Sequence, residues 1–167
     1  EAATLVFTLA GNTYVPYFFA EACDITPCEV IFKDQNGTEL GRIETYEGAT
    51  LAEIPYTEAN LPAIEEGSKF RGWYYNSGKK VTVGDVINGN TTIQALVTPI
   101  ETATVGSVQT YPLNNSIFYP EDHETIEIAG GSFHDGTRGW HFAGNGTIKV
   151  QVAGNAVVVV TVCTYSE

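Results

Sequence analysis

The chain has 167 residues and a formal net charge of -12, from 8 Lys and Arg against 20 Asp and Glu. This acidity disfavours nucleic acid and anionic membranes, because both require positive potential on the protein, and we expect neither as a partner. It also disfavours polyanionic glycans unless a cation intervenes or the charge is locally reversed. The hydrophobic fraction of 43% is enough for a core, so the chain is expected to fold.

Alternating apolar residues predict strands in the first quarter of the chain. Residues 5–9 and 13–19 are expected to pair around Gly11. Residues 29–34 are expected to turn at Asn36-Gly37 into a second strand, because Asn-Gly between alternating apolar residues is a strong hairpin signal. These patterns predict a mainly β chain.

The remaining elements are expected to be short. Thr50-Leu-Ala-Glu-Ile predicts one short helix, a restart at residues 57–61 stays open, and Pro55 and Pro62 keep both pieces short. The last two strands, 147–152 and 156–162, are predicted to form a hairpin, and the valine-rich second strand is expected to be buried. Further strands are predicted at residues 69–75, 91–97, 125–128 and 139–142.

Three cysteines cannot all pair, and none belongs to a Cys-x-x-Cys motif. Cys23 and Cys28 bracket a short loop and are close enough in sequence to be bridged, an alternative that stays open. Cys163 lies in an apolar run and is expected to be a buried free thiol.

Residues 29–98 resemble the Listeria–Bacteroides repeat of internalin B-type surface proteins. The resemblance implies a compact β-grasp-like module of secreted bacterial proteins, in which the aromatic–Gly–Trp–Tyr strand helps build the core. Trp73 is therefore expected to be mainly structural. One departure is Val97, where the repeat often has Trp. The residues that carry the resemblance are Val30, Phe32, Gly37, Gly48, Pro55, Phe70, Gly72, Trp73, Tyr74 and the segment Gly89-Asn-Thr-Thr-Ile-Gln-Ala95.

Residues 131–160, which include the Gly-Thr-Ile hairpin signal, resemble an accessory β-sandwich module of secreted bacterial pectate lyases. The resemblance implies a non-catalytic, jelly-roll-like sandwich. We therefore expect three parts: N-terminal strands in residues 1–28, a β-grasp-like repeat in 29–98, and a sandwich module in 99–167. The N-terminal strands are expected to complete the sandwich.

Catalysis and metal binding have weak sequence support. The best acid–base cluster, residues 120–124 with His134-Asp135 and His141, lacks the spacing of a nucleophile elbow or a metal-binding helix. Acids before a strand usually belong to a solvated turn, so we predict no enzyme. No cofactor is expected; a structural Ca²⁺ held by Glu121, Asp122 and Asp135 stays open.

Glycan binding is the leading hypothesis, because aromatic faces stack on sugars and polar groups orient their hydroxyls. In a strand, Trp73 and Tyr75 should share one face and Tyr74 the other, so at least one of these three rings should be exposed. The basic residues of segment 69–80 have two interpretations, a positive patch for a uronate or a charged hairpin that keeps the chain soluble. They are Lys69, Arg71, Lys79 and Lys80. The candidate ligand-binding residues are Trp140, His141, Arg138, Tyr119, Tyr74, Tyr75, Lys79 and Lys80.

The predicted function is thus a non-catalytic carbohydrate-binding module of an extracellular bacterial polysaccharide-degrading protein. Its expected partners are a polysaccharide or oligosaccharide, such as pectin or a neutral plant cell-wall glycan, and other domains of a larger parent chain. The alternative is a structural spacer or adhesin-like stalk module of a surface protein. An exposed strip of aromatic rings would favour binding, whereas inward-facing rings would favour the spacer.

Overall fold

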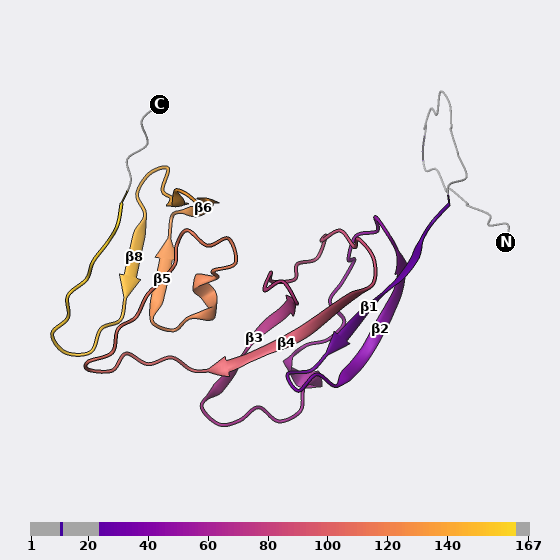
Figure 1. Ribbon diagram of the computed structural model, residues 1–167, viewed down its shortest axis with the longest axis horizontal. Coiled ribbons are helices and arrows are strands. Elements are labelled where there is room, and N and C mark those ends of the chain that lie inside the picture. Colours follow the sequence, from indigo (N-terminus) through magenta and orange to yellow (C-terminus); the bar gives the residue numbers. More distant parts are fainter. Residues whose placement is uncertain (1–10, 12–23, 163–167) are drawn as a thin grey trace.

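The computed structural model describes residue 11 and residues 24–162, and over these ranges the protein is mainly β, as predicted. A four-stranded sheet and two smaller strand pairs lie along the molecule's long axis (Figure 1). No helix among the described residues is long and apolar enough to cross a membrane.

The four-stranded sheet has the order β2-β1-β4-β3, with β1 and β4 parallel at its centre and the outer strands antiparallel to them. The predicted hairpin between β1 and β2 is confirmed. Gly37 adopts φ 83° at its turn, and the Asp34 carboxylate accepts the backbone N–H groups of Asn36 and Thr38 at 2.8 Å each. The four strands are β1 (Pro27–Lys33), β2 (Glu39–Tyr46), β3 (Ser68–Tyr75) and β4 (Thr91–Pro99).

One face of this sheet carries the hydrophobic core. Phe32 is fully buried and packs edge-on against Trp73, with ring centroids 5.6 Å apart. The Trp73 indole N–H donates to the carbonyl oxygen of Tyr56 at 2.8 Å. A buried ring with its polar atom satisfied is a structural residue, so the predicted core role of Trp73 is confirmed.

A β-bulge in β3 sets which side chains meet this core. Phe70 pairs with Val97 and Gly72 pairs with Leu96, which leaves Arg71 as the extra residue. The bulge turns Phe70 to the same face as Trp73, although these residues are three apart. Arg71 and Tyr74 therefore face the opposite side of the sheet.

The predicted helix at residues 50–54 is wrong. Thr50 forms a bridge with Val86, and the Leu51 N–H donates to the Asp85 carbonyl at 2.8 Å. These contacts with residues 85 and 86 use the backbone groups that a helix would need, and Pro55 would in any case end a helix here. The helical structure in this region is a single 3-10 turn, η1 (Glu58–Asn60).

The C-terminal part consists of two strand pairs, β5 with β8 and β6 with β7. They are smaller than the predicted sandwich, which stays a prediction; residues 4–19, its expected N-terminal strands, lie outside the described residues. The elements are the 3-10 turn η2 (Pro120–Asp122), β5 (Ile126–Ala129), β6 (Ser132–Asp135), β7 (Gly139–His141) and β8 (Thr147–Val150).

The predicted hairpin between residues 147–152 and 156–162 is not formed. β8 pairs instead with β5, where Ile128 lies opposite Ile148. Residues 156–162 lie outside any strand and the valine side chains are exposed, Val157 by 91% and Val159 by 85%. The apolar run therefore does not form the buried strand that its composition indicates.

The cysteine predictions are tested only in part. Cys28 is a buried free thiol at the edge of the core. Cys23 and Cys163 lie outside the described residues.

Candidate functional site

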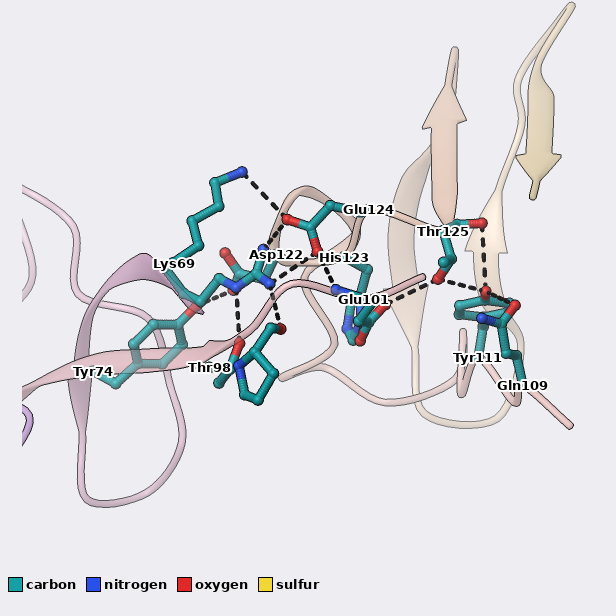
Figure 2. Close-up of polar contacts among 12 residues, drawn as sticks. Lys69, Tyr74, Thr98, Glu101, Gln109, Tyr111, Asp122, His123, Glu124 and Thr125 are labelled. Carbon is teal, nitrogen blue, oxygen red and sulfur yellow. Dashed lines mark hydrogen bonds and ion pairs between the residues drawn. The ribbon is translucent and has the colours of Figure 1, made fainter. Parts of the chain in front are cut away.

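The candidate site is the junction where the C-terminal part covers the outer face of β3 and β4. Figure 2 shows side chains from both parts meeting there, among them Lys69, Tyr74 and Thr98 from the sheet, Asp122 from the end of η2 and Glu124 from the segment after it. The residues that cross this junction are charged or polar and form two adjacent groups, a hydrogen-bonded network around Arg71 and a second group around Tyr74.

Arg71 is the centre of the network, because its side chain is only 2% exposed and both ends of its guanidinium are used. Two N–H groups bind the two carboxylate oxygens of Glu124. The Nε–H donates to Thr98 Oγ1 at 2.9 Å, and Nη2 also donates to the Pro99 carbonyl at 3.1 Å. Hydrogen bonds from Arg71 lower the pKa of Glu124 to about 2. The bidentate pair therefore persists as ions over most of the pH range.

Tyr74 is the second anchor, and it faces away from the core because it alternates with Trp73 along β3. Its hydroxyl donates to Asp122, whose other carboxylate oxygen accepts from Lys80 Nζ at 2.6 Å. The ring lies edge-on to Tyr119, with centroids 5.9 Å apart, and the Tyr119 hydroxyl accepts the backbone N–H of Lys80 at 2.9 Å. Burial and the hydrogen bond to Asp122 raise the pKa of Tyr74.

A further layer connects the junction to the C-terminal part. The Glu101 carboxylate lies 2.7 Å from His123 Nδ1 and accepts the Thr125 hydroxyl at 2.9 Å. Thr125 is 1% exposed and also accepts the Tyr111 hydroxyl at 2.8 Å. His123 stacks on Phe118 with ring centroids 4.9 Å apart. The network is thus continuous from β3 to β5.

The four basic residues of segment 69–80 do not form a free positive patch. Arg71 and Lys69 bind Glu124, the latter at 3.4 Å, and Lys80 binds Asp122. Lys79 binds Asp85 at 2.6 Å. Each of these four cations has a carboxylate partner, so the positive charge that would bind a uronate is neutralised.

The expectation of an exposed ring among Trp73, Tyr74 and Tyr75 is wrong. Trp73 and Tyr75 do face the core side and Tyr74 the other, but the C-terminal part covers Tyr74, which is 9% exposed. Tyr75 is half-buried and its hydroxyl donates to Asp85 at 3.1 Å. Burial of the ring, and to a smaller extent the hydrogen bond to Asp85, raise the pKa of Tyr75 to about 12. Lys79 lies over the Tyr75 ring at 5.6 Å.

The other candidates lie on the β6–β7 hairpin. Trp140 is half-buried opposite Phe133, whereas His141 and Arg138 are exposed. The indole Nε1 of Trp140 is buried and has no hydrogen-bond partner among the described residues. Trp140 lines a shallow depression with Pro120, Glu121, His123, Glu124, Ile126, Glu127 and Ile128.

The eight predicted ligand-binding residues therefore fall in three places. Tyr74, Lys80 and Tyr119 belong to the junction, Tyr75 and Lys79 lie at the end of β3 and just after the turn that follows it, and the remaining three belong to the β6–β7 hairpin. Sequence reasoning missed Glu101 and Thr125, and it assigned Glu124 to a solvated turn. The available signal was charge complementarity between the basic segment 69–80 and the acidic segment 121–124.

No protein-family model, curated protein or solved structure matches the chain. Within residues 24–162, no group of three or more His, Cys, Asp or Glu side chains is arranged to hold a metal ion. Of the three acids considered for calcium, Asp122 is bound by Lys80 and Tyr74, and Asp135 lies on the β6–β7 hairpin.

Proposed function

We propose that the chain is a non-catalytic structural module of a larger, secreted bacterial protein. In this proposal the β-grasp-like part and the C-terminal part are held as one rigid unit that spaces or presents neighbouring domains. The observation that carries the proposal is the buried, bidentate Arg71–Glu124 pair at the junction between the two parts.

The chemistry of the junction suits a fixed joint. A guanidinium and a carboxylate joined by two parallel hydrogen bonds constrain orientation as well as distance. Removing one partner of such a pair leaves a buried charge and typically costs about 3–5 kcal/mol. Two parts joined in this way do not rotate freely, which is the property that a spacer needs.

The distribution of aromatic rings supports the same proposal. A glycan site needs exposed rings, since stacking requires an accessible face. Among the described residues, Tyr46 is the exposed aromatic side chain, with 45% of its surface accessible. It is a single ring at the end of β2, whereas a binding strip needs at least two.

Binding of a neutral glycan is the second candidate, and the depression at Trp140 is the observation that favours it. The accessible part of the half-buried Trp140 ring offers a stacking surface, and Glu121 and Glu127, which line the same depression, offer carboxylate acceptors for sugar hydroxyls. Glu121 and Glu127 are paired with Lys80 and Lys149, so neither lysine is a free cation for a uronate, and the candidate predicts a neutral glycan as the ligand.

Tryptophan fluorescence titrated with soluble neutral and uronic polysaccharides separates the two candidates. The spacer proposal predicts no saturable change with any glycan. A saturable change with a neutral glycan that is lost in Trp140→Ala and retained in Tyr46→Ala would replace it with glycan binding. Trp73 is an internal reference, because it is 5% exposed and lies in the core of the other part.

A further inference from the structure

We propose that His134 and His141 form a two-histidine binding site for a divalent transition-metal ion such as Cu²⁺, Ni²⁺ or Zn²⁺. The two residues lie on the neighbouring strands β6 and β7, and their ring centroids are 6.1 Å apart at an interplanar angle of 73°. Both side chains are exposed. The site is separate from the junction, and the proposal does not depend on the proposed function.

The pairing of the hairpin brings the two rings together. Ser132 lies opposite His141 and Phe133 lies opposite Trp140, and the register then slips at His134. Side chains alternate between faces along a strand, so His134 shares the face of Ser132 and His141, while Phe133 and Trp140 occupy the other face. A bulge at His134 directs its ring toward His141. The hairpin therefore has one apolar face and one imidazole-bearing face.

Asp135 prepares His134 to act as a ligand. Its carboxylate lies 2.7 Å from Nδ1 of His134, and a carboxylate can only accept, so Nδ1 carries the hydrogen. In the neutral ring, Nε2 is then the nitrogen left with a lone pair that a metal ion can use. The carboxylate is held in place by the backbone N–H groups of Thr137 and Arg138, at 2.9 and 2.7 Å. A carboxylate that orients a histidine in this way is the usual outer partner at metal sites.

The donor set selects the class of metal. Two imidazole nitrogens suit Cu²⁺, Ni²⁺ and Zn²⁺, whereas Ca²⁺ and Mg²⁺ prefer oxygen ligands. Because the chain supplies two ligands, water completes the coordination sphere and the ion exchanges readily. The net charge of -12 favours the approach of a cation.

Isothermal titration calorimetry of the full chain with CuCl₂, NiCl₂ or ZnCl₂ in a non-coordinating buffer measures the metal affinity and tests the proposal. We expect one saturable site per chain. His134→Gln and His141→Gln should each weaken binding by at least about tenfold, and Asp135→Asn by about 10–100-fold. All three substitutions are on a solvent-facing hairpin, so circular dichroism should be unchanged.

The matched control is His123→Gln, since His123 is the one histidine of the chain outside the proposed site and contacts Glu101 at the junction. This variant should retain the affinity. Quenching by Cu²⁺ provides a second readout, because Trp140 lies on the same hairpin and Trp73 does not. Absence of saturation at millimolar metal, or binding that survives both His134→Gln and His141→Gln, would overturn the proposal and indicate only diffuse binding to surface carboxylates.

Discussion

Replacing Arg71 by Met should destabilise the protein far more than its single charge suggests. Met preserves most of the aliphatic stem, so the change removes the guanidinium and its hydrogen bonds to Glu124, Thr98 and Pro99. Glu124 then keeps only the Glu101 N–H at 3.1 Å and Lys69 at 3.4 Å. Its carboxylate remains charged without the partner that offset its burial.

The expected magnitude follows from the exposure of the two side chains. Breaking a fully buried pair costs about 3–5 kcal/mol, and because Glu124 is 24% exposed, water recovers part of this, leaving about 2–4 kcal/mol. Urea unfolding measures the change. With a slope of about 2 kcal/mol per molar urea, the middle of the usual range, the midpoint should fall by about 1–2 M.

Arg42→Met is the matched control, since Arg42 also binds two carboxylates, those of Glu29 and Glu39, but its side chain is 46% exposed. Exposed pairs contribute about 0–1 kcal/mol, so this midpoint should hardly move. If both variants shift by the same small amount, the buried pair does not stabilise the junction and the reasoning is refuted.

Three further predictions concern the same strand and its partners. Glu124 has a pKa of about 2 in the folded protein against an ordinary 4.5, so its contribution is complete above about pH 4.5 and is lost as the pH falls toward 2. The difference in unfolding free energy between the wild type and Glu124→Gln should shrink over that range; a constant difference would contradict the assignment. Gly72→Ala should lower the free energy of unfolding by about 1–3 kcal/mol, because Gly72 has φ 125°. The control Gly136→Ala, whose added Cβ would lie 3.6 Å from its nearest neighbour, should leave the free energy of unfolding nearly unchanged. Equal losses in the two variants would count against a conformational cause. In an absorbance titration with base, the Tyr75→Phe variant should lack one tyrosine that ionises near pH 12 in the wild type. If the variant instead lacks a tyrosine that ionises at the ordinary pH of an exposed side chain, Tyr75 is not buried in solution.

Local patterns predicted the parts of the fold that depend on neighbouring residues. The Asn36-Gly37 turn formed as expected because Gly accepts a positive φ without strain. The core role of Trp73 was expected from the resemblance to the Listeria–Bacteroides repeat and from the usual burial of Trp, and the structure buries it.

The junction depends on contacts that no local pattern contains. Arg71 and Glu124 are separated by 53 positions in the sequence, and an acidic turn has the same composition whether it meets water or a guanidinium. The alternation of side chains along a strand correctly predicted that Tyr74 and Trp73 face opposite sides of the sheet. It did not indicate that the side with Tyr74 is covered by another part of the chain. The valine run shows the converse, since its apolar composition indicates burial and the described residues leave it exposed.

Residual dipolar couplings of backbone amides in the weakly aligned chain test the central claim, that the two parts form one rigid unit. A single alignment tensor should fit residues 27–99 and residues 118–150 together, and Arg71→Met should separate the fit into two tensors. Two tensors of different magnitude in the wild-type protein would mean that the parts reorient independently, and the account of a rigid spacer would be wrong.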